Sequence, residues 1–468
     1  MFGKVVFIIF FNVVLCKDCY WNSRPYELFS TKTPYVTVRG DLRDEKLPEI
    51  DNCQPISLWS LHRHGNRSPG RQVTEDINEL QKNIINAIKN EFENSRTRLL
   101  STNCFQDIED LLNWKWNATL ETSPNYLTGV GYEEIYELGK RVNQRFTTLL
   151  SGDYDKFYFR PTNEQRTITS AIAFVHGLMY ETNISLYENI DGPWKEDNVI
   201  RPYEHCIKYQ EEVFSGQKIV DELAAYDTSP EVLAVRDRAQ MHLGTAYQLT
   251  VSDTYNLYEL CRFYRSWTTN LRSPWCSFFT NNDLEVLEYR DDVRHYYRNG
   301  YGSQINVNLG AAPLKNLYEH FKAVTQGNGK NIVSYFSHDT IFEMVLSALG
   351  LYKDIKPLRG SLRNTSRLWR TSEIAAFSTN LIAVLFKCQE EGTETHRVQF
   401  LINEKPTSLC PAEGCTWAQF VDRFQVFTNS TTEFCQYEDI NIHLPNKSGA
   451  VSLLFMNILT LLSILLIK

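Results

Sequence analysis

Three short apolar runs, each ending in a polar loop, dominate the hydrophobic pattern of the chain. The runs are residues 56–61 (ISLWSL), 157–159 (FYF) and 332–336 (IVSYF). Their length and their β-branched or aromatic content predict buried strands. A pattern typical of a helix follows each loop. Strand, polar loop and helix in repeated order predict an open α/β sheet, which binds its ligand at the carboxyl ends of the strands.

Capping signals mark where the three helices are predicted to begin. The signals are Ser68 followed by Pro69, Thr162 with Gln165, and Thr340 with Glu343. The first pair offers an N-cap and a proline at the first helical position, and the other two have the spacing of a capping box. Each predicted helix therefore starts directly at a polar loop.

Residues 181–309 have a different pattern, rich in aromatic residues and helix formers and with few runs typical of strands. We expect a mostly helical insertion that covers the ends of the strands. The α/β core is then assigned to residues 17–180 and 310–445. The chain shows no internal repeat and no low-complexity tract, which excludes solenoids and disordered scaffolds.

Both ends of the chain carry apolar segments. Lys4 precedes the apolar run 5–16, which predicts a signal peptide over residues 1–16, because about 12 residues are too short to span a bilayer. At the other end, Ser448, Gly449 and Ala450 precede an apolar run, so residues 446–468 resemble a signal for attachment of a glycosylphosphatidylinositol (GPI) anchor. A plain C-terminal membrane span remains the alternative.

Cysteines and glycosylation motifs also favour export. Removal of Cys16 with the signal peptide leaves ten of the 11 cysteines, an even number that predicts disulfides of open connectivity. Their spacing does not predict a structural metal site. Sequons lie at Asn117, Asn183, Asn364, Asn429 and Asn446. We expect Asn66, which also begins a sequon, to be unglycosylated. The predicted location is extracellular, at the cell surface or lumenal.

The net charge of -8 argues against a general nucleic-acid binder, which needs a broad basic surface. It does not exclude a small anionic substrate, because a local group of arginines can override the global sign.

Residues 63–69 (RHGNRSP) hold the densest group of candidate catalytic residues. A phosphate monoester is already anionic, so its cleavage needs cations, a nucleophile in line and an acid for the leaving oxygen. Arg63 and Arg67 supply planar guanidinium groups that match phosphate oxygens. His64 can act as the nucleophile and form a phosphohistidine. We expect Gly65 to let the backbone approach the phosphate closely. Solvated surface charge does not account for all of these residues at one strand-to-helix turn.

The run 63–69 resembles the RHGxRxP signature of the histidine phosphatase superfamily, acid phosphatase branch. Residues 159–167 look like the second phosphate-binding element of that family, which implies that Arg166 contacts the phosphate. The resemblance also implies that His338 donates a hydrogen bond to the phosphate and that Asp339 protonates the leaving group. It implies a phosphoglycerate mutase-like fold, a three-layer open sheet with helices on both faces plus a helical cap.

The residues themselves leave simpler roles open for two of these positions. Arg166 could be an exposed arginine in the first turn of a helix, although the helix dipole disfavours a cation there. Asp339 could be a helix N-cap.

Longer blocks are similar to the multiple inositol polyphosphate phosphatases. They are FSTKTPY (29–35), SPWCSFF (273–279), EYRDDVRHYYRNGYG (288–302), AFSTNLIAVLFKC (376–388) and INEKP (402–406). This resemblance implies inositol hexakisphosphate and lower inositol phosphates as substrates, with 2,3-bisphosphoglycerate as a further candidate. It implies no metal ion or cofactor, since arginines supply the positive charge.

The chain departs from that group at one functional position. The group commonly reads His-Ala-Glu where this chain has His338-Asp339-Thr340, so the acid is shorter and lies one residue earlier. Its reach differs, which leaves the leaving-group preference open. The alternatives are a broad-specificity extracellular acid phosphatase or an inert surface receptor for inositol phosphates. The presence of both His64 and Asp339 argues against the receptor.

Overall fold

The computed structural model describes residues 19–20, 26–41, 50–268 and 272–437. The predicted signal peptide, the predicted anchor signal and Asn446 lie outside these residues. Within the described ranges, no helix combines the length and the apolar character needed to cross a membrane.

A mixed sheet with the strand order β2-β3-β1-β4-β5-β6 forms the centre of the α/β core. Strands β2, β3 and β1 are parallel, whereas β4 and β5 continue the sheet in antiparallel fashion and β7 also pairs with β5. The strands are β1 (Cys53–Arg63), β2 (Phe157–Pro161), β3 (Ile332–Ser337), β4 (Asn380–Glu390), β5 (Thr393–Ile402), β6 (Lys405–Pro406) and β7 (Cys415–Thr416). All three predicted strands are confirmed, and together they form the parallel half of the sheet.

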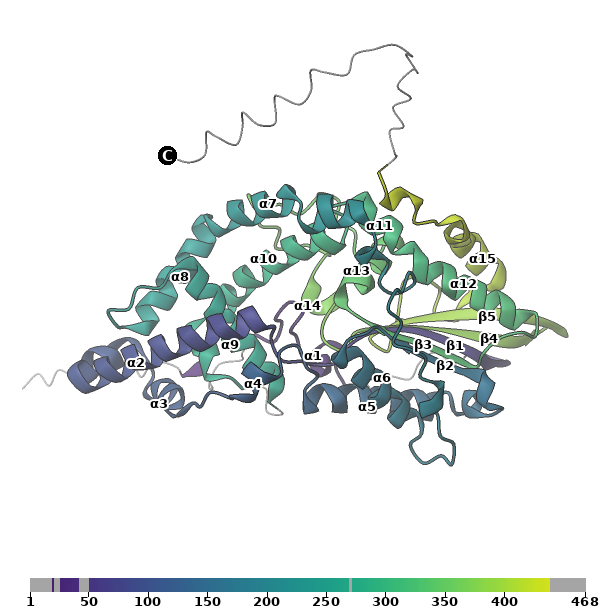
Figure 1. Cartoon of the computed structure of the whole chain (residues 1–468), viewed down its shortest axis with the longest axis horizontal. Coiled ribbons are helices and arrows are strands. Elements are labelled where there is room, and N and C mark those ends of the chain that lie inside the picture. Colours follow the sequence, from purple (N-terminus) through teal and green to yellow (C-terminus); the bar gives the residue numbers. More distant parts are fainter. Residues whose placement is uncertain (1–18, 21–25, 42–49, 269–271, 438–468) are drawn as a thin grey trace, which may run out of the picture.

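Helices cover both faces of this sheet, which confirms the predicted three layers (Figure 1). Successive residues of a strand point to opposite faces. Leu58 accordingly packs in one apolar cluster with α5 (Gly129–Arg145) and α6 (Gln165–Leu178). Trp59 packs in a second cluster with α12 (Ala311–Thr325) and α13 (Asp339–Ala348).

Most of the remaining helices lie to one side of the sheet (Figure 1). Within the predicted insertion they are α7 (Gln217–Asp227), α8 (Pro230–Leu243), α9 (Val251–Trp267), α10 (Asn281–Asn299) and α11 (Gln304–Leu309). The predicted helical character of this segment is confirmed. The helix α2 (Arg71–Thr102), with α3 (Phe105–Asn113) and α4 (Thr119–Thr122), lies on the same side and α2 packs against α9. Two separate parts of the chain thus build the helical region, and the domain boundaries stay a prediction.

Short elements complete the chain. The helices are α1 (Tyr35–Arg39), α14 (Thr371–Ile374) and α15 (Trp417–Phe424). The 3₁₀ helices are Thr147–Leu150, Tyr154–Lys156, Tyr187–Asn189, Pro202–Glu204, Pro274–Phe278, Gln425–Asn429 and Glu433–Cys435. Residues Tyr209–Phe214 form a short π-helix.

Five disulfides pair the ten cysteines that the sequence assigned to the mature chain. They are Cys19–Cys104, Cys53–Cys388, Cys206–Cys435, Cys261–Cys276 and Cys410–Cys415. Because disulfides form and persist in oxidising compartments, they indicate the secretory pathway. The predicted acceptors Asn117, Asn183 and Asn429 are exposed, whereas Asn66 is fully buried and donates from Nδ2 to the carbonyl of Ser266. Glycosylation itself stays a prediction.

The predicted start of α2 is wrong. This helix begins at Arg71, with Gly70 as its N-cap. Ser68 does not cap it, because its hydroxyl donates to the carbonyl of Ser123 and so joins the loop to the end of α4.

The two predicted capping boxes are also wrong. The helix α6 begins at Gln165 without a side-chain cap, and the Oγ1 atom of Thr162 donates to Thr167 instead. The helix α13 begins at Asp339 with His338 at the N-cap, so Thr340 is already inside the helix. The polar side chains of these loops are committed to tertiary contacts, which local spacing does not reveal.

Candidate functional site

The carboxyl ends of the three parallel strands lie side by side. In the sheet register Arg63 pairs with Ser337, and Pro161 pairs with Phe336. The loops that follow these strands therefore meet at one edge of the sheet, as the sequence predicted. They bring together all six candidate residues, namely Arg63, His64, Arg67, Arg166, His338 and Asp339, through the contacts described below.

His64 has the environment of a nucleophile. Its side chain is buried, and its Nδ1 atom lies 2.8 Å from the carbonyl oxygen of Gly65. Because a carbonyl only accepts, Nδ1 carries the proton and Nε2 keeps its lone pair. Burial and the charges of Arg63 and Arg166 hold the pKa of His64 well below its usual range. The imidazole is therefore neutral, as an attack on phosphorus requires.

Arg63 is held in place from several sides. It is fully buried, and its Nη1 atom donates to the carbonyls of Thr31 and of Ala375, the latter at 2.8 Å. The guanidinium lies 4.7 Å from the ring centroid of Phe377, and Nη2 lies 3.1 Å from the carboxylate of Asp339. These contacts orient the guanidinium and connect the first loop of the site to the third.

Arg67 and Arg166 add two more cations to the same space. Burial and repulsion from Arg166 and Arg63 lower the pKa of Arg67 to about 9. Arg166 lies 3.3 Å from Glu164 and 3.4 Å from Nδ1 of His338, so it is not a freely exposed arginine. In the described part of the chain, the buried Nε atoms of Arg67 and Arg166 have no hydrogen-bond partner. Such a concentration of positive charge favours an anion.

His338 links the second and third loops. Its Nδ1 accepts from Arg166, so its Nε2 carries the proton and donates to Oγ1 of Thr162 at 3.1 Å. Both ring nitrogens thus contact protein groups in this structure. A direct hydrogen bond to phosphate, which the family resemblance implies, requires the Nε2–H group to turn away from Thr162.

Asp339 is the first residue of α13, and His338, not Asp339, is the N-cap. Its Oδ1 atom accepts from the backbone N–H of Thr340 at 3.0 Å. Burial alone raises the pKa of Asp339, but the neighbouring charges of Arg63 and His295 hold it well below its usual range.

Position 65 must be a glycine because another segment of the backbone packs directly against it. A Cβ atom on Gly65 would lie 2.3 Å from the carbonyl oxygen of Gly131, and one on Gly131 would lie 2.1 Å from that of Asn66. The beginning of α5 therefore packs directly on the backbone of the 63–69 loop. This close contact between two chain segments is a reason for glycine that the sequence did not reveal, and the predicted approach of the Gly65 backbone to phosphate stays a prediction.

Glu134, on the next turn of α5, was not found from the sequence. Its carboxylate accepts from the backbone N–H of Asn66 at 3.2 Å and from the hydroxyl of Ser378 at 2.8 Å. It also accepts from the backbone N–H of Tyr35 at 3.3 Å. Glu134 therefore holds the signature loop against the N-terminal segment and the approach to β4, and no local pattern marks that role.

Lys32, in the FSTKTPY block, was likewise missed. Burial and repulsion from Arg262 lower the pKa of Lys32 to about 7, and Arg67 contributes to this shift. The block lies against the site because the carbonyl of Thr31 accepts from Arg63. Lys32 adds a cation beside the arginines, which only the folded chain reveals.

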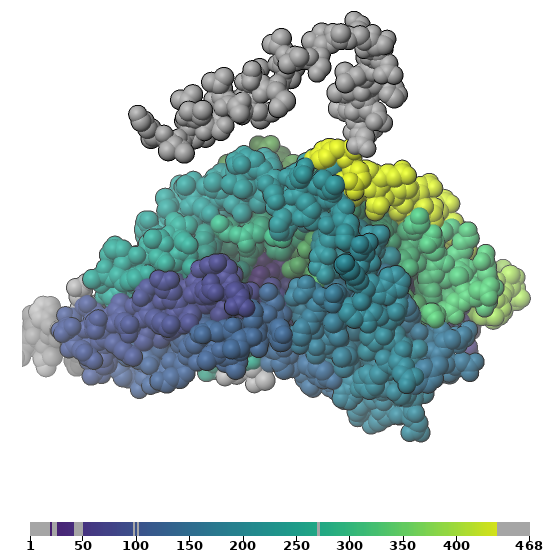
Figure 2. All heavy atoms as spheres, viewed as in Figure 1, coloured from purple at the N-terminus to yellow at the C-terminus, as the bar shows by residue number. Residues whose placement is uncertain are grey.

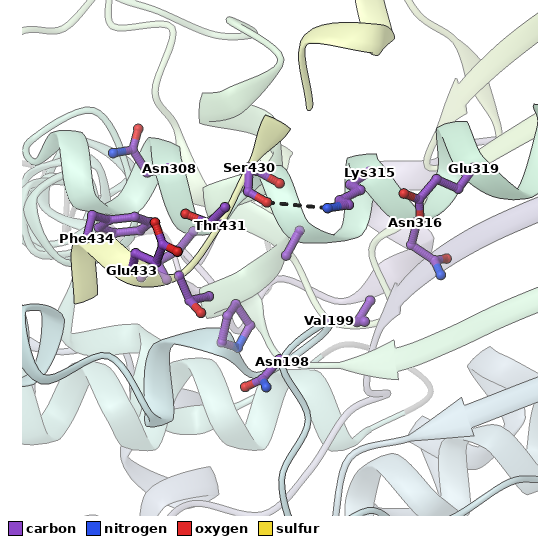
Figure 3. A pocket seen from close by; sticks show the side chains of 14 residues that line it. Asn198, Val199, Asn308, Lys315, Asn316, Glu319, Ser430, Thr431, Glu433 and Phe434 are labelled. Atoms are coloured by element: carbon purple, nitrogen blue, oxygen red, sulfur yellow. Dashed lines mark hydrogen bonds between the residues drawn. The ribbon is translucent and has the colours of Figure 1, made fainter. Parts of the chain in front are cut away.

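The surface is hollowed between the helical region and α2. Figure 2 shows this hollow between teal residues of the 181–309 segment and the blue residues of α2, with purple N-terminal residues at its floor. A separate pocket of about 450 Å³ lies between α11, α12 and residues 430–434 (Figure 3). None of the six candidate residues lines that second pocket.

Residues 56–403 match the model of the histidine phosphatase superfamily, branch 2. The chain is 29% identical over 415 residues to multiple inositol polyphosphate phosphatase 1 of Drosophila melanogaster, covering 86% of this chain and 85% of that protein. It is 25% identical over 445 residues to the Gallus gallus protein of the same name, covering 91% and 94%.

Solved structures share the fold. The phytase from D. castellii superimposes with a TM-score of 0.64 at 17% identity, covering 83% of this chain and 82% of that one. The multiple inositol polyphosphate phosphatase of Bifidobacterium longum in complex with inositol hexasulfate gives 0.62 at 15% identity, covering 82% and 94%. The family match contains β2, β3, β4 and β5, most of β1, and the three loops that carry the six candidate residues. The chain belongs to branch 2 of the histidine phosphatase superfamily and is a histidine acid phosphatase.

Proposed function

We propose that the protein removes phosphate groups from inositol polyphosphates, including inositol hexakisphosphate, through a phosphohistidine on His64. The observation that carries this proposal is a neutral, buried His64 with a free Nε2 lone pair among the three arginines of the site. Curated relatives named as multiple inositol polyphosphate phosphatases support the substrate class.

In the first half-reaction, the Nε2 lone pair of His64 attacks phosphorus and forms a P–N bond. The ester P–O bond breaks, and its electron pair goes to the leaving oxygen, which takes a proton from the carboxyl group of Asp339. The products are phosphohistidine, the free alcohol and the Asp339 carboxylate. Arg63, Arg67 and Arg166 stabilise the charge that spreads over the phosphoryl oxygens in the transition state.

Asp339 can carry that proton only when the phosphate is bound. In the free site, the charge of Arg63 at 3.1 Å keeps the carboxylate ionised. A phosphate dianion offsets the positive charge of the arginines, and this raises the pKa of Asp339 toward the range of a useful acid. Substrate binding and protonation of the acid are therefore coupled.

In the second half-reaction, the Asp339 carboxylate takes a proton from water as the water oxygen attacks phosphorus. The P–N bond breaks, and its electron pair returns to Nε2 of His64. Inorganic phosphate leaves, and both the histidine and the protonated acid are regenerated. The arginines stabilise this transition state in the same way as the first.

Replacement of the nucleophile tests the mechanism. We expect His64→Ala to release no phosphate from inositol hexakisphosphate, with a melting temperature close to that of the parent chain. Turnover that survives in His64→Ala contradicts the phosphohistidine.

A second experiment identifies the substrates. The parent enzyme is incubated with inositol hexakisphosphate, and separately with 2,3-bisphosphoglycerate, and the products are separated. Hydrolysis of p-nitrophenyl phosphate but not of inositol hexakisphosphate supports the broad-specificity alternative.

We further propose that a GPI anchor attaches the enzyme to the cell surface. The five disulfides and the small residues before the apolar run 451–467 support this location. Treatment of expressing cells with a phospholipase C specific for phosphatidylinositol is expected to release the activity into the medium. Activity that stays on treated cells supports a membrane span instead.

A further inference from the structure

The carbonyl end of α9 lies against the signature loop. The last carbonyl groups of a helix have no partner within the helix and must find one elsewhere. At this end, the Oγ1 atom of Thr268 lies 3.3 Å from the carbonyls of Tyr264 and of Arg265. The carbonyl of Ser266 accepts instead from Nδ2 of Asn66 at 2.7 Å. The helix thus takes one of its caps from the signature loop.

A second hydrogen bond joins the same helix end to the loop. The indole Nε1 atom of Trp267 donates to the carbonyl of Arg67 at 3.1 Å. The ring of Trp267 is itself packed, with its centroid 5.5 Å from that of Phe263 and 4.8 Å from that of Tyr264. The last two residues of α9 therefore bind two consecutive residues of the signature loop.

The helix α9 is a firm support for these two bonds. It packs against both α2 and α8 in the helical region. The disulfide Cys261–Cys276 also ties it to the 3₁₀ helix Pro274–Phe278. A rigid element positions the groups bonded to it more precisely than a loop does. The end of α9 can therefore fix the place of the signature loop.

The loop is held from the opposite side as well. The backbone N–H of Thr128, at the start of α5, donates to the carbonyl of Asn66 at 2.9 Å. Asn66 and Ser266 are fully buried, so the bond between them is shielded from water. The backbone that leads to Arg67 is thus clamped between a helix of the core and a helix of the helical region.

Arg67 needs such a clamp, because its guanidinium group lies among like charges. Burial and repulsion from Arg166 and Arg63 lower the pKa of Arg67. Its Nη1 atom donates to the carbonyl of Ser68, within the same loop. The place of the guanidinium group therefore depends on where the backbone of the loop is held.

We propose that Asn66 and Trp267 are positioning residues, which hold the backbone of Arg67 so that its guanidinium group meets the phosphate of the substrate. The proposal rests on the phosphate-binding role of Arg67 in the function proposed above. It assigns a role to the variable position of the RHGxRxP signature, which Asn66 occupies. It also makes the end of α9 a support of the catalytic centre.

Removal of each donor tests the proposal. Trp267→Phe keeps an aromatic ring but loses the indole N–H group. We expect it to raise KM for p-nitrophenyl phosphate and the inhibition constant of inorganic phosphate by about fivefold each, because one hydrogen bond that places Arg67 is lost. Asn66→Ala is expected to raise both constants at least as much, since it also leaves the buried carbonyl of Ser266 without its partner.

A second tryptophan provides the matched control. The indole of Trp116 donates to Glu121 at 2.9 Å, so Trp116→Phe removes an equivalent bond that involves neither Asn66 nor Arg67. We expect its KM and inhibition constant to equal those of the parent. Kinetics are measured at a temperature at which thermal melting shows every variant to be folded.

A double-mutant cycle separates positioning from general damage. If Trp267 acts through Arg67, the double variant Trp267→Phe/Arg67→Ala has the KM and inhibition constant of Arg67→Ala alone. Additive increases in the double variant overturn the inference. Unaltered constants in either folded variant, Trp267→Phe or Asn66→Ala, also overturn it, even where the melting temperature falls. Trp267→Phe decides the question if Asn66→Ala does not fold.

The same cycle distinguishes this inference from the proposed function. A rise of both constants in Arg67→Ala without one in Trp267→Phe overturns the positioning role and leaves the proposed function standing. Absence of a rise in Arg67→Ala overturns both the positioning role and the phosphate-binding role of Arg67.

Discussion

At the scale of single residues, the site is a balance between buried cations and the few anions that offset them. The grouping of Arg63, His64 and Arg67 could be predicted from the sequence because Arg63 ends one strand and the other two lie in the loop that follows it. Lys32 and Glu134 could not be predicted, because each reaches the site from a distant segment through packing that no local pattern encodes. Arg166, His338 and Asp339 were also named as candidates, because each lies at or beside the start of a helix that follows a predicted strand and fits the family resemblance, whereas Lys32 and Glu134 lie outside those strand-to-helix loops.

We expect Lys32 to make substrate affinity depend on pH near neutrality. Its pKa is lowered to about 7, so the free enzyme carries the ammonium charge below pH 7 and loses it as the pH rises through 7. We expect that charge to attract a second phosphate group of the substrate. We therefore expect Lys32→Met to raise KM for inositol hexakisphosphate by about tenfold at pH 6, but by less than about twofold above pH 8.

Steady-state kinetics at both pH values measure this effect. The comparison substrate is p-nitrophenyl phosphate, which carries a single phosphate group. Lys322→Met, at an exposed position of α12, is the matched control. An equal rise of KM at both pH values would show that the charge of Lys32 is not the cause.

At the scale of elements, the existence and pairing of the strands followed from their apolar content, whereas the helix starts did not follow from capping signals. Thr162 has the spacing of a cap, but its hydroxyl is bonded to Thr167 and to His338. Tertiary hydrogen bonds compete with local capping, and at a functional loop the tertiary bonds prevail. The contact between α5 and the signature loop is a further element-level feature, since it depends on two glycines from separate segments.

The two ends of the GVG run, residues 129–131, allow a direct test of that contact. Gly131→Ala forces a Cβ atom against the backbone of Asn66, whereas a Cβ atom on Gly129 meets nothing within 4 Å. We expect Gly131→Ala to destabilise the protein by about 1–3 kcal/mol and to lower kcat by about a hundredfold, because the loop that holds His64 must shift.

Gly129→Ala is the control on the same helix and is expected to keep parental activity. Thermal melting and kcat for p-nitrophenyl phosphate report both effects. Parental kcat in folded Gly131→Ala would show that the loop tolerates the displacement.

At the scale of the whole molecule, the open α/β sheet followed from the order of strands and helices, and its three layers from the family resemblance. The arrangement of the helical region could not be predicted. The segment 181–309 was recognised by its composition, whereas α2 to α4 resembled ordinary helices of the core. Only the packing of α2 against α8 and α9, and of α3 against the turn Pro274–Phe278, places them with the insertion. Disulfide pairing was undetermined for the same reason, since Cys53 and Cys388 meet only because β1 and β4 are neighbours.

The position of β3 between β1 and β2 has a consequence for biosynthesis. During translation, β1 and β2 are complete long before residues 332–337 exist, yet neither can pair with the other across the gap that β3 fills. Loop closure over so many residues makes assembly of the sheet slow, and unpaired edges invite aggregation. A nascent chain that ends before β3 therefore lacks both His338 and Asp339 and has no complete phosphatase centre. The centre is incomplete until the segment carrying Asp339, and after it the segment with Ala375 and Phe377 that holds Arg63, have been synthesised and packed.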